Sequence, residues 1–347
     1  MSESAGTLRP EARGRAFALG LNPYGLTYHL GLQGAGGPRA NPRGAGLEGF
    51  IAIATELGAS VLEIYDPWLR ALSDDGLRAL RDRLAALNMI PVVSSGLTMG
   101  PFESALRSAR ALDAKVIRYG LTTVLCGDRH ALGEKWGELV AQVRAALADR
   151  GPRASDEGRI LAIENHQDFG SDELAEFCET TRGIGICLDT GNTFPVAEAP
   201  LDFVGRVAEH VRHIHLKDYR VQFTDKGYRL VRCAIGDGAV PIAAMLDVLA
   251  GQGEKLTAVL EPGALEARHV RLLRPEWWSF YPPKSAPALA ACLAAARINR
   301  LADEADYRTP WERGEDAAIA EYELAMIRRS ARNMRAIGLG NGMEIDG

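Results

Sequence analysis

Short apolar runs alternate along the chain with longer stretches in which apolar residues recur at helical spacing. In stretches 74–88 and 135–150, Leu, Ala and Val recur at i, i+3, i+4 and i+7, which predicts helices with one buried face. The apolar runs are apolar on both faces and rich in β-branched residues, as is typical of parallel strands covered by helices. The predicted strands are 17–21, 60–66, 90–96, 115–120, 160–166, 185–192, 211–218 and 256–263.

Strands and helices that alternate in this way, over about 250 residues, fit a closed (β/α)₈ barrel. An open doubly wound sheet is the alternative, and it should carry a Gly-rich phosphate loop after its first strand. No GxGxxG follows 17–21. We therefore predict an α/β fold, a (β/α)₈ TIM barrel over residues 15–265 with a C-terminal helical extension over 266–347 packed on the barrel.

The predicted extension contains two strongly helical stretches, 286–305 and 316–338. One is expected to be the eighth barrel helix, and the other to pack on the barrel or on a second subunit. An aromatic, Pro-rich break precedes them. Its side chains Trp277, Trp278 and Tyr281 could form the wall of a sugar-sized pocket or pack as core between helices.

The composition is that of an ordinary globular protein, with 47% hydrophobic residues, 24% charged residues and a net charge of −5. This acidity argues against nucleic acid or an anionic membrane as the main partner. No apolar run approaches the roughly 18 residues of a membrane-spanning helix. Five scattered cysteines without CxxC spacing indicate reduced thiols, and with the polar N-terminus they predict a cytoplasmic protein.

Polar side chains lie at the carboxyl ends of four successive predicted strands, and these are the candidate functional residues. The carboxyl ends of barrel strands form one mouth, so these side chains should meet there. They are Glu164, Asp189, His215 and Glu261. Three carboxylates and an imidazole suit Mn²⁺, Mg²⁺, Co²⁺ or Zn²⁺. Without a cation the carboxylates would raise one another's pKa. We therefore expect one bound divalent ion, with Mn²⁺ as the first expectation. The alternative is that each acid alone is a helix cap or part of a surface ion pair.

Two histidines of the seventh strand, His213 and His215, point to the same face at different depths. His215 lies nearer the carboxyl end and is the predicted metal ligand. His213 is either a substrate contact or a buried, hydrogen-bonded core residue. His166 lies two residues beyond Glu164 on the same face, where it could act as a general base or only contact a substrate hydroxyl.

Further candidates for substrate binding are charged or amide side chains near the same mouth. Lys217 could polarise a substrate oxygen or pair with Asp218. An unpaired cation within a strand would be costly, so Arg118 is expected to pair with a carboxylate or to reach the mouth. Glu63 in the second strand and Asn192 after the sixth complete the set.

At these residues the chain resembles the xylose isomerase-like TIM-barrel superfamily, the sugar isomerase/epimerase group that also contains endonuclease IV. The motifs IENH, LDTGN, HIHLKD and LEPG carry the resemblance and occur in the family's order. The resemblance implies that Glu164, Asp189, His215 and Glu261 hold the metal. In epimerase members the two glutamates also exchange protons on the two faces of the substrate, so Glu164 and Glu261, with His166, are the predicted catalytic residues.

The implied chemistry is proton abstraction next to a carbonyl, through an enediolate that the metal stabilises. Return of the proton to another face or carbon makes a keto-sugar epimerase or isomerase, which is the expected activity. Loss of a substituent would instead make a carbon–oxygen or carbon–carbon lyase on an oxo-sugar, similar to inosose dehydratase or the C-deglycosidases. Two departures from keto-sugar 3-epimerases keep this alternative open: Asn192 stands where they carry His, and Val221 where they carry Arg.

Two other classes are less consistent with the sequence. An abasic-site endonuclease of this superfamily uses three metals and a basic groove, whereas this chain is acidic and has only seven histidines. A non-catalytic barrel subunit is the other, although all four ligands are present. We expect a small carbohydrate as the binding partner, neither nucleic acid nor membrane, and a homo-oligomer, with a small second subunit as a further possibility.

Overall fold

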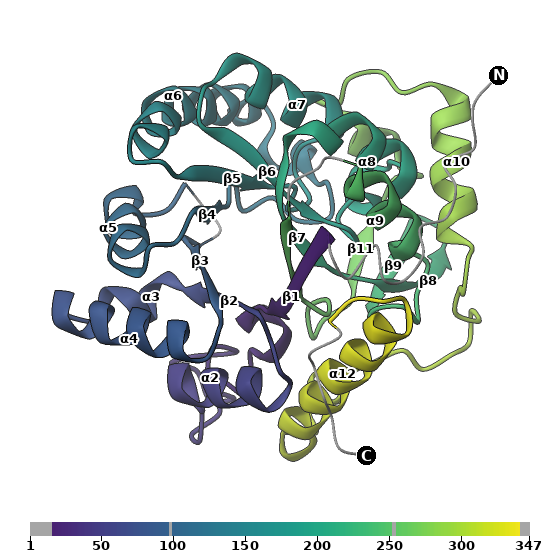
Figure 1. The fold of residues 1–347 in the computed structure, drawn as a ribbon. Coiled ribbons are helices and arrows are strands. Elements are labelled where there is room, and N and C mark those ends of the chain that lie inside the picture. Colours follow the sequence, from purple (N-terminus) through teal and green to yellow (C-terminus); the bar gives the residue numbers. More distant parts are fainter. Residues whose placement is uncertain (1–15, 97–98, 252–254, 341–347) are drawn as a thin grey trace.

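A closed barrel of eight parallel strands organises the chain, as predicted, in the order β1-β10-β7-β6-β5-β4-β3-β2 (Figure 1). The computed structural model describes residues 16–96, 99–251 and 255–340. The barrel strands are β1 (Phe17–Leu21), β2 (Val61–Tyr65), β3 (Ile90–Ser94), β4 (Val116–Tyr119), β5 (Ile160–Glu164), β6 (Ile184–Asp189), β7 (Val211–Leu216) and β10 (Leu256–Leu260). Each observed strand lies within or beside its predicted run. The predicted runs extend past the strands because their last polar residues are in the loops at the barrel mouth.

Helices surround the barrel on the outside (Figure 1). They are α2 (Gly46–Glu56), α3 (Asp66–Arg70), α4 (Asp74–Ala86), α5 (Phe102–Leu112), α6 (Lys135–Asp156), α7 (Ser171–Thr180), α8 (Pro200–Val207) and α9 (Ile242–Ala250). Short 3₁₀ turns lie at η1 (Pro23–Leu26), η2 (Arg129–Leu132), η3 (Phe194–Val196), η4 (Ala208–His210) and η5 (Pro275–Trp278). The helix α4 shows the predicted pattern, because its buried residues Leu77, Leu80 and Leu84 share one face.

Alternation along the strands divides the barrel interior into an apolar layer and a polar layer. Val61 and Val259 belong to a small buried cluster completed by Ala18 and Val92. Two residues further along the same strands, and therefore on the same face, lie Glu63 and Glu261. The interior is thus apolar towards the amino ends of the strands and polar towards their carboxyl ends.

A three-stranded antiparallel sheet follows the seventh barrel strand, and the sequence analysis missed it. Its strands are β8 (Tyr219–Thr224), β9 (Gly227–Arg232) and β11 (Arg268–Val270), in the order β11-β9-β8. The predicted strands are runs that are apolar on both faces, as parallel barrel strands are. In this hairpin buried and more exposed residues are mixed, so it did not match that pattern.

The chain beyond β11 forms α10 (Ala286–Ala296), α11 (Pro310–Arg313) and α12 (Asp316–Ala336). The first predicted helix ends at residue 296 instead of 305, and the second at 336. α12 packs on η1 and β10 and pairs with α2 through Arg328 and Glu56, 2.9 Å apart. It therefore occupies the place of the eighth barrel helix, while α10 lies beside the small sheet (Figure 1). Cys292 and Ile327 belong to the same buried cluster as the barrel residues.

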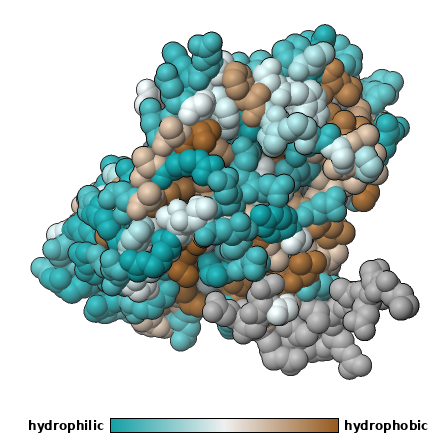
Figure 2. Space-filling model, turned by 90° about the horizontal axis from the view of Figure 1, so that it is seen from above, coloured by the Kyte–Doolittle hydropathy of each residue, from teal (hydrophilic) through white to brown (hydrophobic). Residues whose placement is uncertain are grey.

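The face of the molecule in Figure 2 is predominantly hydrophilic, with apolar residues in scattered patches. The most exposed large apolar side chains among the described residues come from separate elements: Ile90, Leu201, Leu273, Phe280 and Ile298. Within the described parts of the chain, no helix combines the length and the apolar character that crossing a bilayer requires.

Candidate active site and metal centre

Four side chains at the carboxyl ends of adjacent strands converge on one point. Glu164 ends β5, Asp189 ends β6, His215 lies in β7 and Glu261 follows β10. Each offers one ligand atom, and these atoms all lie within 4.8 Å of one another. All four residues are buried. The structure therefore brings together the four predicted metal ligands.

Three potential metal-ligand atoms of this cluster face one another without hydrogen-bond partners. Glu164 Oε1, Glu261 Oε2 and His215 Nδ1 are buried and make no hydrogen bond. His215 Nδ1 lies 2.8 Å from Glu261 Oε2 and 3.3 Å from Glu164 Oε1. Buried polar atoms are normally satisfied, so this convergence of lone pairs fits a divalent cation that accepts all of them.

Glu63 determines which nitrogen of His215 faces the cluster. His215 Nε2 lies 2.6 Å from Glu63 Oε2, so Nε2 carries the proton that Glu63 accepts and Nδ1 is directed at the carboxylates. Burial lowers the pKa of His215, but the acids around it, Cys187, Glu63 and Glu261, raise that pKa well above 6.5. The position beside Nδ1 therefore favours a positive charge, which a bound metal ion would supply.

Two buried cations partly balance the carboxylates. Arg118 pairs with Glu164, as the sequence suggested, and Lys217 pairs with Asp189 and with Glu261, the latter at 2.6 Å. Burial raises the pKa of Asp189 to about 7, with Glu261 and Glu164 adding to the increase and Lys217 opposing it. The carboxylates thus still repel one another despite these two cations, which is a repulsion that a divalent ion held between them would relieve.

The predicted ion pair between Lys217 and Asp218 is not what the structure shows. The carboxylate of Asp218 accepts four backbone N–H groups, those of Tyr219, Gly236, Gly238 and Val240, at 2.8 to 3.0 Å. Lys217 points instead into the cluster of carboxylates. Asp218 organises the loop after the small sheet and takes no part in the charge balance of Lys217.

A cavity of about 260 Å³ opens beside this cluster. Four residues predicted from the sequence line it: Arg118, His166, Lys217 and Glu261. It also has wall residues that the sequence analysis did not single out as site residues: Thr27, Gln33, Gln167, Tyr219, Pro262, Ala264, Leu265 and Arg268. Tyr24 of η1, directly after the first strand, lines it as well. The size of the cavity suits a single small sugar.

His166 is positioned as a neutral imidazole on the cavity wall. Burial lowers its pKa to about 4, although the nearby Glu164 carboxylate acts in the opposite direction. Its Nδ1 is buried and has no hydrogen-bond partner. A neutral ring with a free nitrogen next to the cavity can accept a proton from a bound molecule.

Glu63, His213 and Asn192 are not among the residues lining the cavity, although they were predicted to contact substrate. His213 is buried, with Nδ1 2.7 Å from Thr257 Oγ1 and Nε2 3.0 Å from Glu63 Oε2. This geometry supports the buried, hydrogen-bonded alternative for His213. Asn192 is also buried, and its amide has no hydrogen-bond partner, while its backbone N–H donates to Asp189 Oδ1.

Tyr219 is a cavity residue that the sequence analysis missed. Its ring is held between the glycines of two motifs, because a Cβ on Gly191 or Gly263 would lie 2.9 Å or 2.5 Å from ring carbons of Tyr219. The motifs LDTGN and LEPG thus provide space for this ring as well as metal ligands.

The aromatic residues of the C-terminal segment do not form the wall of this cavity. Trp277 donates to the carbonyl oxygen of Cys126 at 2.9 Å, and Tyr281 donates to that of Gly127 at 3.0 Å. The rings of Trp277 and Tyr281 stack, and Trp278 meets Trp277 edge-on. Of the two predicted roles, the structure supports packing.

The loop that these aromatic residues hold in turn supports the cavity. The backbone N–H of Cys126 donates to Gln167 Oε1 at 2.8 Å, and that of Gly127 to the carbonyl oxygen of Gln167 at 3.1 Å. Gln167 has a φ of 131°, a region that residues other than glycine rarely adopt. This contact therefore fixes the backbone next to His166.

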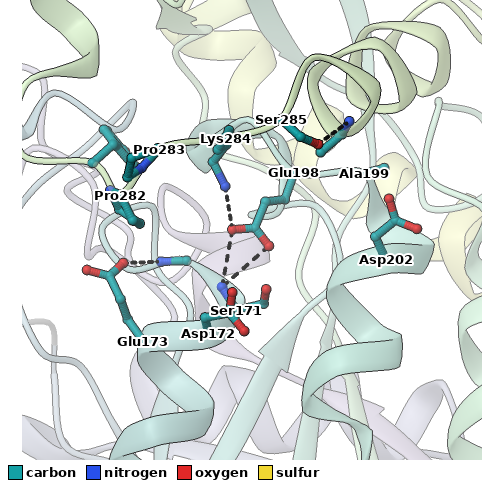
Figure 3. A pocket seen from close by; sticks show the side chains of 13 residues that line it. Ser171, Asp172, Glu173, Glu198, Ala199, Asp202, Pro282, Pro283, Lys284 and Ser285 are labelled. Atoms are coloured by element: carbon teal, nitrogen blue, oxygen red, sulfur yellow. Dashed lines mark hydrogen bonds and ion pairs between the residues drawn. The ribbon is translucent and has the colours of Figure 1, made fainter.

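A second cavity, of about 250 Å³, lies at the amino ends of α7 and α8 (Figure 3). Several of its polar groups are already paired. Lys284 Nζ lies 2.8 Å from Glu198, which also accepts the backbone N–H of Ser171. Glu173 accepts the backbone N–H of Gly170 at 2.8 Å. The unpartnered donor atoms of the metal cluster make the first cavity the candidate active site.

The family model described as "Xylose isomerase-like TIM barrel" matches residues 51–274. The chain belongs to this family. Among solved structures of the xylose isomerase-like fold, a D-psicose 3-epimerase is similar with a TM-score of 0.52 and 15% identity, over 85% of this chain and 95% of that one. This similarity concerns the fold alone.

Two relatives of this xylose isomerase-like protein are named as enzymes. The 3-oxo-isoapionate decarboxylase of Pectobacterium atrosepticum is 24% identical over 250 residues, which cover 70% of this chain and 85% of the relative. The inosose dehydratase of Clostridium beijerinckii is 25% identical over 111 residues, 30% of this chain and 36% of the relative. The relatives act on sugar-derived substrates, and a sugar-modifying enzyme is the class that they support.

Proposed function

We propose that this protein is a divalent-metal-dependent enzyme that removes a proton next to the carbonyl of a small oxo-sugar. The observation that carries the proposal is the set of four buried ligand atoms within 4.8 Å of one another, three of them without a hydrogen-bond partner. Glu164, Asp189, His215 and Glu261 would hold the ion, with Mn²⁺ expected first and Mg²⁺, Co²⁺ or Zn²⁺ compatible with the same donors.

The bound ion would supply Lewis acidity, which stabilises negative charge on the carbonyl oxygen of the substrate. The chain's own residues position and move protons. His166 has a free, neutral nitrogen on the cavity wall, and Glu261 lies on the same wall. One accepts the proton next to the carbonyl, and the other can return it. Arg118 and Lys217 pair with the carboxylates and favour their ionised forms.

The fate of the substrate after proton removal distinguishes two candidate activities. Return of the proton to another face or to the neighbouring carbon makes the protein a keto-sugar isomerase or epimerase, which is the function proposed from the sequence. A lyase is the second candidate, favoured by the decarboxylase relative, which aligns over 250 residues, and by the inosose dehydratase. A cytoplasmic location and a homo-oligomer, with or without a small second subunit, stay predictions.

Metal analysis of purified protein tests the proposal. We expect about one divalent ion per chain in the wild type and none in a Glu164→Gln/Glu261→Gln double variant. Glu176→Gln is the matched control, because Glu176 is an exposed carboxylate paired with Arg144 on the outside of α7. Incubation of the loaded wild type with keto-sugars in D₂O should then exchange the proton next to the carbonyl, and release of water after this step would identify a dehydratase. A decarboxylase would instead release CO₂ only from an oxo-sugar that carries a carboxylate, because loss of CO₂ itself forms the enolate. The proposal would be overturned if the purified wild type contained no metal and unfolded at the same temperature as the double variant.

A further inference from the structure

In the part of the chain that the structure describes, Arg268 on the cavity wall meets no partner for its charge. It lies in β11, where its backbone pairs with Leu230 of β9, and its side chain lines the cavity beside the metal cluster. Its Nε is buried without a hydrogen-bond partner. Within residues 16–96, 99–251 and 255–340, no acid or carbonyl group pairs with its guanidinium. A partly buried cation in this condition is unfavourable unless a ligand supplies the counter-charge.

Three other arginines in or directly beside the small sheet are engaged. Arg271 pairs with Asp128 at 2.7 Å, and Arg232 donates to the carbonyl oxygens of Gly263 and Gly25 at 2.7 Å. Arg229 lies over the ring of Tyr307. Among these four arginines, the unpaired one is the one that faces the cavity.

The charges around the metal cluster leave Arg268 uncompensated. Glu63, Glu164, Asp189 and Glu261 supply four negative charges when ionised, and Arg118 and Lys217 supply two positive charges. A divalent ion would supply the remaining two. The loaded centre is then neutral, and the guanidinium of Arg268 is an additional positive charge at the same cavity.

Two amide side chains also line the cavity. Gln167 Oε1 accepts from the backbone of Cys126 at 2.8 Å, so its NH₂ group is what this amide offers to a ligand. Gln33 Oε1 lies 3.2 Å from Thr27 Oγ1, whose one hydroxyl hydrogen also has Glu323 within reach. The wall therefore suits a molecule rich in acceptor oxygens.

We propose that the cavity binds a sugar acid, whose carboxylate pairs with Arg268 while its hydroxyl and oxo groups face the metal cluster. This inference rests on the proposed function and specifies its substrate class. A guanidinium binds a carboxylate through two parallel hydrogen bonds. One unpaired cation matches a monoanion better than the dianion of a phosphate ester.

Two probes that differ in one group test the proposal. D-Gluconate carries a carboxylate where D-glucitol carries a CH₂OH group, and neither has the oxo group required for turnover. We expect the metal-loaded protein to bind D-gluconate at least about tenfold more tightly than D-glucitol in calorimetric titration. Arg268→Gln should abolish this preference without weakening D-glucitol, whereas Arg229→Gln on the neighbouring strand should retain it.

The outcomes separate this proposal from the proposed function. Equal binding of the two probes, binding of neither, or an unchanged preference in Arg268→Gln would overturn the sugar-acid assignment. Tighter binding of D-glucose 6-phosphate than of D-gluconate would also overturn it, in favour of a phosphate ester. Metal content is measured on the same samples. Protein that holds metal but does not prefer D-gluconate would overturn the sugar-acid assignment and leave the proposed metal-dependent function standing. If the purified protein contains no metal and still prefers D-gluconate to D-glucitol after chelator treatment, the anion site is supported and the metal-dependent function is contradicted.

Discussion

At the scale of single residues, Glu63 positions the predicted metal ligand His215 without being a ligand itself. Its Oε2 lies 2.6 Å from His215 Nε2 and 3.0 Å from His213 Nε2, and it is buried. Burial alone would raise the pKa of Glu63, but the two histidines hold that pKa well below 4.5, so the group is a carboxylate. An ionised acceptor behind a ligating histidine fixes its tautomer and increases its basicity.

Glu63→Gln should therefore weaken metal binding without removing any ligand. We expect the dissociation constant for Mn²⁺ or Zn²⁺, measured by competition with a chelating dye, to rise about 10- to 100-fold. Glu48→Gln is the control, since Glu48 is exposed and pairs with Arg83 on the outside of the barrel. An unchanged constant in Glu63→Gln would show that His215 keeps its orientation without this carboxylate.

The sequence predicted the metal ligands better than the cavity wall, for a physical reason. The position of Glu164 or Asp189 follows directly from the end of a barrel strand, and all strands end at the same mouth. Tyr219 and Arg268 come from the small sheet, whose place depends on long-range pairing. Gln167 owes its orientation to a backbone conformation that its residue type does not favour.

At the scale of elements, the small sheet is anchored by one carboxylate. Asp218 accepts four backbone N–H groups, three of them from the loop between residues 236 and 240. A chain of alternating polarity such as 219–232 could have indicated a hairpin, but the barrel pattern assigned this stretch to a connection. Asp218, the residue directly before the hairpin, thus joins the start of β8 to the loop that follows β9.

Asp218→Ala should destabilise the protein strongly, because buried N–H groups would lose their acceptor. Each unsatisfied group costs about 1–3 kcal/mol, so we expect the free energy of unfolding in urea to fall by at least about 3 kcal/mol. Asp225→Ala lies in the turn of the same hairpin, where the side chain is exposed, and should change it by less than about 0.5 kcal/mol. Similar losses in both variants would contradict the anchoring role.

At the scale of the whole molecule, the last helix completes the active-site wall as well as the barrel. Glu323 of α12 is buried and accepts the backbone N–H groups of Tyr28 and His29, at 3.1 Å and 2.8 Å, and the hydroxyl of Thr27. Thr27 lines the cavity. Residues close to 300 positions apart in sequence are thus joined at the mouth, so the C-terminal segment contributes to the site and the barrel depends on it.

Glu323→Ala tests this dependence. The variant leaves two backbone N–H groups without an acceptor next to the cavity, so we expect the free energy of unfolding to fall by about 2–4 kcal/mol. Hydrogen exchange at the amides of Tyr28 and His29 should accelerate more than exchange in the distant strands, because the lost contacts are local. Glu321→Ala on the exposed side of the same helix should leave both measurements unchanged. Equal exchange rates at these two amides in Glu323→Ala and the wild type would mean that η1 and the following turn hold their shape without α12, and that the helix only covers the barrel.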